Sequence, residues 1–193
     1  MTGPVTGPVT GNAEQVLELC RSREPTLARG RLICVDGPAG SGKTTLADEI
    51  AELSGAPVLH MDDMFEGWDG LPRITAQLQT LLRPLATGRS GTYRRWDWPG
   101  NAWAETVLVP PAPLLVLEGV GSGSGEVADL VTVLAWVEVP YDLRMARGLE
   151  RGGVGVAENW RHWAIDEQTL FERERTRERA DVVLDGRVGS LRA

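Results

Sequence analysis

Eight consecutive residues have the types and spacing of a phosphate-binding loop: glycine, four residues, glycine, lysine and a hydroxyl residue. Glycines let backbone N–H groups turn toward a phosphate, and a helix that follows adds a partial positive charge. Lys43 would reach the β- and γ-phosphates of a nucleoside triphosphate, and the Thr44 hydroxyl would hold Mg²⁺. A glycine-rich turn before an ordinary helix is the weaker alternative, because all four fixed positions match. The residues predicted to bind the donor are Gly37, Pro38, Ala39, Gly40, Ser41, Gly42, Lys43, Thr44 and Thr45.

Three carboxylates follow apolar segments that have the length of buried strands. Asp62 and Asp63 come after residues 57–61, and Glu118 closes the apolar run 113–117. In a parallel α/β sheet, ligand groups gather beyond the carboxyl ends of the strands, so these side chains are expected beside the phosphate loop. Either aspartate could act as a general base on a substrate hydroxyl or help to order Mg²⁺, and Glu118 could hold Mg²⁺ through water. The alternatives are an acidic surface turn or helix cap for the aspartates and a solvated role for Glu118.

Three arginines, Arg144, Arg147 and Arg151, are spaced three and four residues apart and therefore share one face of a predicted helix. Guanidinium groups on one face could clamp the phosphates during transfer, although a solvated basic stripe has the same spacing. The glycine-rich stretch 152–155 predicts a flexible joint there, as a closing lid would need.

An aromatic and charged segment, Tyr93-Arg94-Arg95-Trp96-Asp97-Trp98-Pro99, lies between two predicted elements. Its rings could stack on a planar group while the charged residues bind the polar edge of that group. An edge strand whose tryptophans cover the core is an equally good interpretation.

Hydrophobic periodicity places these residues on alternating strands and helices. Asn12 is predicted to cap the first helix. Five strands that alternate with helices predict an α/β fold, with a five-stranded parallel sheet covered by helices on both faces and a small lid. The predicted strands are 32–35, 57–61, 113–119, 131–139 and 181–184, and the predicted helices are 13–22, 43–54, 74–87, one around 141–160 that carries the lid, and 158–179.

Bulk properties are those of a globular protein with one domain. The chain has 193 residues, 42% hydrophobic and 24% charged, and residues 12–193 are enough for a single α/β domain. Residues 1–11 repeat Thr-Gly-Pro-Val and predict a disordered tail. A net charge of −7 without a long basic run argues against nucleic-acid and anionic-membrane partners. Two cysteines do not suggest a disulfide framework, and no run reaches membrane-spanning length, so the expected location is the cytoplasm.

Residues 31–186 resemble the uridine kinase and phosphoribulokinase-like group of P-loop kinases. The matching motifs are the phosphate loop, the strand-end Asp62 followed by an aromatic residue, the strand that ends in Glu118-Gly119, the arginine-bearing lid helix and the Ala-Asp-Val strand at 180–182. The resemblance implies that Asp62 is the catalytic base, although Asp63 is its neighbour. It also implies an acceptor pocket, whose residues are Asp63, Phe65, Tyr93, Arg95, Trp96 and Asp97.

The resemblance implies an enzyme that uses ATP and Mg²⁺ to phosphorylate a hydroxyl of a small, nucleoside-like acceptor. The paired Trp96 and Trp98 favour an acceptor with a planar ring. The sequence departs from the family pattern because the aspartate follows Tyr93 by four residues and Gly152 replaces the Asp after the last lid arginine. A sugar, a phosphosugar or an antibiotic hydroxyl therefore remain alternative acceptors. A regulatory P-loop ATPase that acts on a protein partner is the rival outside this class. A GTPase is disfavoured because no Asn-Lys-x-Asp tetrapeptide occurs.

Overall fold

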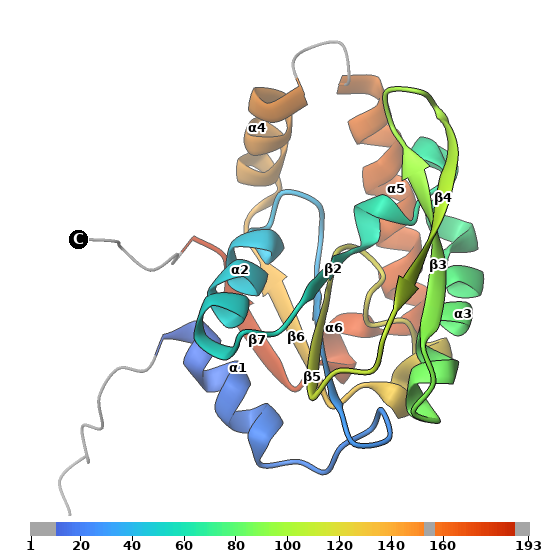
Figure 1. The fold of residues 1–193 in the computed structure, drawn as a ribbon. Coiled ribbons are helices and arrows are strands. Elements are labelled where there is room, and N and C mark those ends of the chain that lie inside the picture. The colour runs from blue at the N-terminus through green and yellow to red at the C-terminus, as the bar shows by residue number, and fades with distance from the viewer. Residues whose placement is uncertain (1–10, 153–156, 188–193) are drawn as a thin grey trace, which may run out of the picture.

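The structure is a computed structural model that describes residues 11–152 and 157–187 (Figure 1). Apart from Gly11, the predicted tail lies outside the described residues, as do the glycines at 153 and 155 of the predicted joint. In the described part of the chain, none of the helices combines the length and apolar character that a membrane crossing requires.

A five-stranded parallel sheet forms the centre of the molecule, as the sequence predicts. Its order is β2-β5-β1-β6-β7, so the strand before the phosphate loop lies in the middle. Each strand is short and largely apolar, which suits a sheet covered on both faces. The strands are β1 Arg31–Asp36, β2 Val58–His60, β5 Leu114–Glu118, β6 Val133–Glu138 and β7 Val182–Asp185.

Two hydrophobic clusters, one on each face, hold the helices on the sheet. Alternate side chains of β1 enter different clusters: Leu32 and Cys34 enter one, Ile33 and Val35 the other. The cluster of Ile33 and Val35 packs α1 Asn12–Arg21 and α2 Lys43–Ser54 against the sheet. The other cluster includes residues of α3 Ile74–Ala86 and of α5 Ala157–Glu174, which lie on the opposite side in Figure 1. The predicted cover on both faces is therefore present.

Three local predictions need correction. Asn12 does not cap α1, because Gly11 occupies the N-cap position and no side chain bonds there. The predicted helix 158–179 is broken at Arg175, whose φ of 51° ends α5 and separates it from α6 Thr176–Arg179. The predicted loop 67–72 contains two short 3-10 turns, Gly67–Asp69 and Leu71–Arg73.

A two-stranded antiparallel hairpin, absent from the prediction, lies beside α3. Its strands are β3 Gly91–Asp97 and β4 Ala102–Val109. Tyr93 and Trp96 are buried there, so this part of the aromatic segment serves the core as the edge-strand interpretation expects.

The helix α4 Tyr141–Gly152 and the start of α5 rise beyond the carboxyl ends of the strands, at the top of Figure 1. The indole of Trp160 lies against α4, because a Cβ on Gly148 would come within 2.6 Å of it. The hairpin, α4 and α5 thus surround the edge of the sheet at which the phosphate loop emerges.

Candidate active site

The phosphate loop runs from the end of β1 into α2, where its conformation requires glycine. Gly37, Gly40 and Gly42 have φ values of 139°, 79° and 104°, a region that other residues rarely adopt. A Cβ on Gly37 would also lie 2.1 Å from the carbonyl oxygen of Val137, because the loop packs directly on β6. Gly42 is the N-cap of α2, so the loop delivers its backbone to the positive end of a twelve-residue helix.

Asp36, the last residue of β1, holds the phosphate loop through hydrogen bonds. Its buried carboxylate accepts hydrogen bonds from the backbone N–H groups of Gly37, Gly121 and Gly123 at 2.7, 2.9 and 2.8 Å. Burial raises the pKa of Asp36 to about 6, although these N–H groups and Lys43 oppose the rise. The carboxylate therefore joins the phosphate loop to the loop after β5. From the sequence, Asp36 was predicted only to end a strand. Its charge, directly after an apolar run, is the feature that could have indicated this anchoring role.

Lys43, the only lysine of the chain, is 93% buried within this loop, with 7% of its surface exposed. Its Nζ donates a hydrogen bond to the carbonyl oxygen of Pro38 at 3.0 Å. The buried Ser41 hydroxyl has no hydrogen-bond partner among the described residues. An ammonium group and an unpartnered hydroxyl inside a glycine-rich turn fit an anionic ligand such as a phosphate.

Thr44 and Glu118 face the same small space. The Thr44 hydroxyl lies 3.4 Å from each carboxylate oxygen of Glu118, longer than an ordinary O–H···O bond. The described residues contain no group of three or more His, Cys, Asp or Glu side chains that could hold a metal. One hydroxyl and one carboxylate nevertheless fit Mg²⁺, which usually takes few protein ligands and completes its shell with water and substrate phosphates.

His60 supports Glu118 and was not singled out from the sequence. Its Nδ1 lies 2.6 Å from Oε1 of Glu118, and this hydrogen bond raises the pKa of His60. Glu118 is nearly buried, whereas the His60 side chain is 40% exposed. The register of β2 and β5, which pairs His60 with Glu118, explains the contact.

Asp62 and Asp63 lie in a 3-10 turn, Met61–Asp63, directly after β2. Asp62 lines the large cavity described below, whereas Asp63 is not among its lining residues. The Asp62 carboxyl is open to the cavity but surrounded by protein, and the loss of solvation raises its pKa while Lys43 opposes the rise. The indole N–H of Trp98 donates to the backbone carbonyl of Asp62 at 2.9 Å and so attaches the hairpin to this turn.

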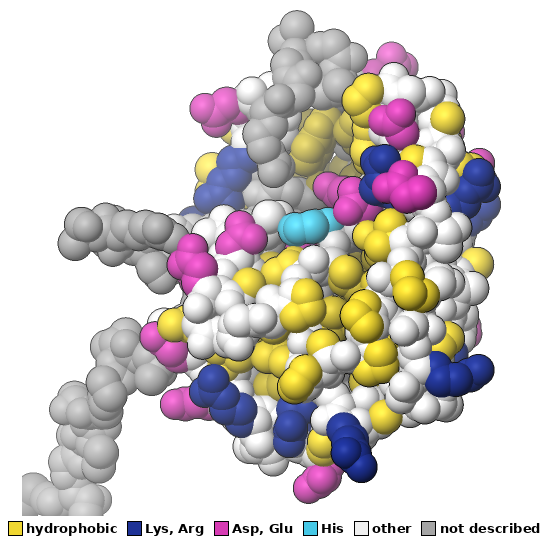
Figure 2. All heavy atoms as spheres, viewed as in Figure 1, with side chains coloured by type: hydrophobic (Ala, Val, Ile, Leu, Met, Phe, Trp, Pro, Cys, Tyr) yellow, Lys and Arg dark blue, Asp and Glu magenta, His cyan; other side chains and the backbone are white. Residues whose placement is uncertain are grey.

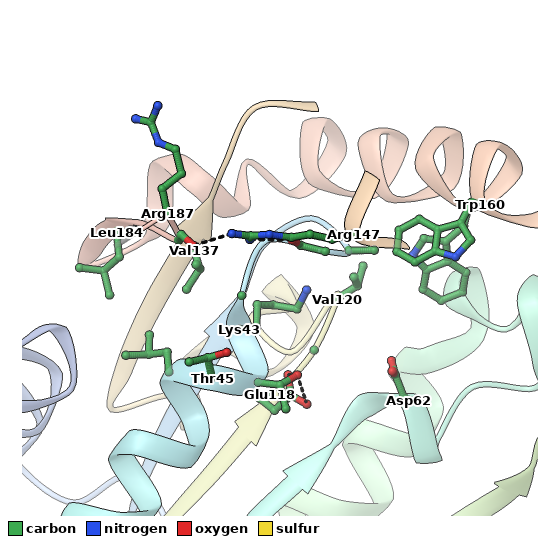
Figure 3. A pocket seen from close by; sticks show the side chains of 18 of the residues that line it. Lys43, Thr45, Asp62, Glu118, Val120, Val137, Arg147, Trp160, Leu184 and Arg187 are labelled. Carbon is green, nitrogen blue, oxygen red and sulfur yellow. Dashed lines mark hydrogen bonds between the residues drawn. The ribbon is translucent and has the colours of Figure 1, made fainter. Parts of the chain in front are cut away.

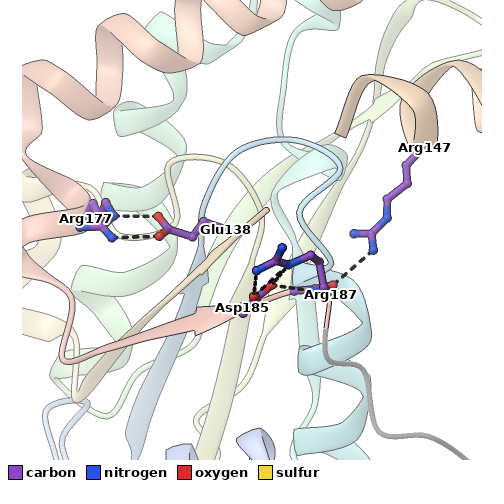
Figure 4. Close-up of polar contacts among 6 residues, drawn as sticks. Glu138, Arg147, Arg177, Asp185 and Arg187 are labelled. Carbon is purple, nitrogen blue, oxygen red and sulfur yellow. Dashed lines mark hydrogen bonds and ion pairs between the residues drawn. The ribbon is translucent and has the colours of Figure 1, made fainter. Parts of the chain in front are cut away.

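The predicted lid arginines lie in different surroundings. Arg147 donates to the carbonyl oxygens of Gly40 and Gly186 at 3.2 and 3.3 Å, and it extends over the phosphate loop (Figures 3 and 4). Arg144 instead pairs with Glu167 of α5 at 2.6 Å and also donates to the Ala39 carbonyl at 3.2 Å. Arg151 belongs to α4, but its side chain lies outside the described part.

Glu167 completes a buried bridge from α4 and α5 to the phosphate loop. One carboxylate oxygen accepts from Arg144 and the other from the Ala39 N–H at 2.8 Å. Burial raises the pKa of Glu167, and the Ala39 N–H and Arg144 oppose the rise. No sequence pattern pointed to this residue, because its partners are far away along the chain.

Removal of this bridge gives the first testable prediction. Glu167→Ala leaves Arg144 and the Ala39 N–H without their acceptor, so we expect the free energy of unfolding to fall by about 3 kcal/mol. Urea denaturation of the wild type and of Glu167→Ala measures this difference in the free energy of unfolding. Glu172→Ala, an exposed carboxylate on the same helix, is the matched control, with an expected loss under about 0.5 kcal/mol. Equal losses in both variants would contradict a structural bridge.

A cavity of about 700 Å³ is lined by part of the phosphate loop and by Thr44, Asp62, Glu118 and Arg147. The phosphate loop and Arg147 lie at its middle, between two ends of different character (Figure 3). In anticipation of the function proposed below, we call the end at Val137, Leu184 and Arg187 the donor end, and the end at Asp62 and Trp160 the acceptor end. At the donor end Arg187 pairs with Asp185, which lowers the pKa of Asp185 to about 2 (Figure 4).

The residues expected to contact the acceptor are only partly at the cavity. Phe65 lines it, whereas the structure places Asp63, Tyr93, Arg95, Trp96 and Asp97 outside its lining. Arg95 pairs instead with Glu105 of β4 at 2.7 Å. The described side chains at the acceptor end include Trp98, which belongs to the aromatic segment expected to stack on a planar group, and three tryptophans that were not expected there: Trp68, Trp160 and Trp163. The sequence feature that could have indicated these rings is the number of tryptophans, seven in 193 residues.

Comparison with known proteins identifies the fold. No protein-family model matches the sequence, and no curated protein matches it. The structure is similar to that of the "possible uridine kinase" of Bacillus stearothermophilus, with a TM-score of 0.59 and 23% identity over 89% of this chain and 98% of that one. It is equally similar to the "putative fructose transport system kinase" of Silicibacter sp. TM1040, with a TM-score of 0.59 and 20% identity over 90% and 98%. The chain thus has the fold of the P-loop kinases, as its resemblance to that group predicted.

Proposed function

We propose that the protein is an ATP-dependent kinase that transfers the γ-phosphoryl group of ATP to a hydroxyl of a nucleoside-like small molecule. The observation that carries this proposal is the shared cavity: the phosphate loop, the pair Thr44 and Glu118, and Asp62 all line it. Such a set supplies phosphate binding, a metal position and a base within one cavity.

The order of these groups along the cavity gives the direction of transfer. Lys43 and Thr44 define where the terminal phosphates would lie, Glu118 lies next to Thr44, and Asp62 lies on the side away from Leu184 (Figure 3). The γ-phosphate should therefore point toward Asp62. The nucleoside of the donor then lies at the opposite end, against Leu184 and Gly186.

Transfer requires one bond to form and one to break. The acceptor oxygen attacks the γ-phosphorus, the bond to the bridging oxygen of the β-phosphate breaks, and ADP leaves with that electron pair. Asp62 receives the proton of the acceptor hydroxyl. Lys43 and Arg147 stabilise the charge on the phosphates. Mg²⁺, held by Thr44 and Glu118 with water, would neutralise charge on the β- and γ-oxygens.

Arg144 has a positioning role in this proposal. Because it is paired with Glu167 and bonded to Ala39, it holds the phosphate loop instead of contacting the substrate. Arg151 stays a proposed lid arginine.

ADP release from ATP and Mg²⁺, measured with and without a panel of nucleosides and sugars, tests the proposed function. We expect at least one nucleoside to stimulate ADP release and to become phosphorylated in equal amount. Slow ATP hydrolysis that no small acceptor stimulates would reject the kinase and favour a regulatory ATPase. Phosphorylation of a sugar alone would retain the kinase and reject the nucleoside-like acceptor.

A further inference from the structure

An aromatic wall, formed by Phe65, Trp68, Trp98 and Trp163, lines the acceptor end of the cavity. Neighbouring rings meet edge to face, with centroids 4.9 Å apart for Phe65–Trp163, 6.0 Å for Trp68–Trp163 and 5.7 Å for Trp68–Trp98. These contacts favour a fixed orientation of each ring. Phe65 and Trp163 are buried and support the other two rings, so the preformed face that a flat group can reach is that of the half-buried Trp68 and the exposed Trp98.

The aromatic wall is attached to the proposed base. Phe65 and Trp68 follow Asp62 within seven residues, and Trp98 lies in the turn of the hairpin. The hydrogen bond from the Trp98 indole to the Asp62 carbonyl joins the two segments, and 37% of Trp98 remains exposed. A molecule that stacks on the wall consequently lies close to the carboxylate of Asp62.

The positively charged side chains of the described lining belong to the phosphate loop, to α4 and to the donor end. Among the described lining residues the cations are Lys43, Arg147 and Arg187. Lys43 and Arg147 bond to carbonyls of the phosphate loop, and Arg187 pairs with Asp185 at the donor end. In the space-filling view, hydrophobic side chains lie inside the hollow, and both acidic and basic side chains lie around its rim (Figure 2). An anionic group at the aromatic wall would meet the carboxylate of Asp62, while Lys43, the described lining cation whose charge reaches Asp62, is directed to the phosphate loop.

We propose that the aromatic wall makes the enzyme select nucleosides with a neutral or positively charged ring and discriminate against those with an anionic ring. This inference rests on the proposed function and adds the charge of the acceptor to it. A flat ring gains stacking energy on tryptophan, and a cation gains further attraction to the ring faces and to Asp62. A ring carboxylate meets repulsion from Asp62, and such unfavourable pairs are a common source of specificity.

Four ribosides with the same ribose hydroxyls separate the effects of ring and charge. Methyl riboside has no flat ring, uridine is neutral, nicotinamide riboside is cationic and orotidine carries a carboxylate. With ATP and Mg²⁺ at saturation, we expect kcat/KM for uridine and nicotinamide riboside to exceed the values for the other two by about tenfold or more. Quenching of tryptophan fluorescence by each riboside without ATP should give the same order of affinity.

Substitutions in the hairpin test whether the aromatic wall causes this selection. Trp98→Leu should raise KM for uridine about tenfold and leave KM for ATP unchanged. Trp98→Phe keeps a ring but loses the indole N–H, so it should retain most of the affinity if stacking is responsible. Trp103→Leu is the matched control, because Trp103 lies on β4 outside the cavity lining and contacts Trp96. It should leave both KM values unchanged.

Two results would overturn the inference, and they differ in what they say about the proposed function. If orotidine or methyl riboside were phosphorylated as efficiently as uridine, the selection by charge or ring would be wrong while the kinase remained. If none of the four were bound or phosphorylated, the nucleoside-like acceptor would be rejected together with the inference. An equal loss in Trp98→Phe and Trp98→Leu would show that the hydrogen bond to Asp62, not the ring, is responsible.

Discussion

Lys43→Ala is expected to reduce kcat/KM for ATP-dependent phosphorylation by a factor of about 10³ or more. The ammonium group lies inside the phosphate loop, and its present partner, the Pro38 carbonyl, can be exchanged for phosphate oxygens. Without it the phosphate loop loses the cation that it carries itself, and Arg147, which extends over the loop from α4, does not replace it. Phosphoryl transfer in P-loop enzymes depends on stabilising the charge of the phosphates and on positioning them, and Lys43→Ala weakens both. Steady-state assays of ADP release with the preferred acceptor measure the effect.

The composition of the chain provides a second measurement for the same residue. Because Lys43 is the only lysine, an amine-reactive acyl-phosphate analogue of ATP should label this one side chain, besides the N-terminal amine. ATP should protect it from labelling. Lys43→Arg keeps the charge but not the compact ammonium geometry, and we expect it to recover only part of the activity. Full activity in Lys43→Ala, with folding verified by circular dichroism, would reject the assignment of the phosphate loop.

The central sheet could be predicted because its strands are continuous apolar runs bounded by turn residues. The phosphate-loop helix, 43–54, was predicted with the bounds that the structure shows, since glycine precedes and follows it. The strand β4 could not be predicted in the same way. Most of its side chains are exposed or half-buried, and Glu105 and Thr106 interrupt its apolar residues, so neither a continuous apolar run nor a regular alternation marks it. The break at Arg175 is also hidden, because a positive φ in a non-glycine residue depends on its surroundings.

The candidate site also contains residues that local sequence patterns predict and residues that they do not. The phosphate loop, Asp62 and Glu118 follow strands directly, so a short motif and the rule for parallel sheets place them together. The aromatic wall does not follow from any local pattern. Trp68, Trp98 and Trp163 come from three segments that the fold brings together, and periodicity alone assigns Trp163 to a helix core. Asp36 and Glu167 bond to backbone N–H groups of distant loops, which no spacing of residue types reveals.

The Asp62→Asn variant is expected to reduce kcat by a factor of about 10³ and to leave ATP binding nearly unchanged. The carboxylate lies at the acceptor end of the cavity, and an amide of the same shape cannot accept the hydroxyl proton. The loss of solvation in the cavity raises the pKa of Asp62 from its ordinary value, which is near 3.9. A base works only when unprotonated, so activity should be lost as the pH falls through this raised pKa. The acid limb of the pH–rate profile should therefore be shifted upward from the ordinary pKa of aspartate in the wild type and disappear in Asp62→Asn.

Asp63→Asn is the matched control, because Asp63 is the next residue in the same 3-10 turn but does not line the cavity. We expect it to keep the acid limb and most of kcat. The opposite result, in which Asp63→Asn loses activity and Asp62→Asn retains it, would assign the base to Asp63 and require the turn to rotate when substrates bind. Lys43→Arg adds an independent check: Lys43 lowers the pKa of Asp62, so a displaced charge in this variant should move the acid limb to higher pH. An unmoved limb would show that the titrating group is not the carboxylate beside Lys43.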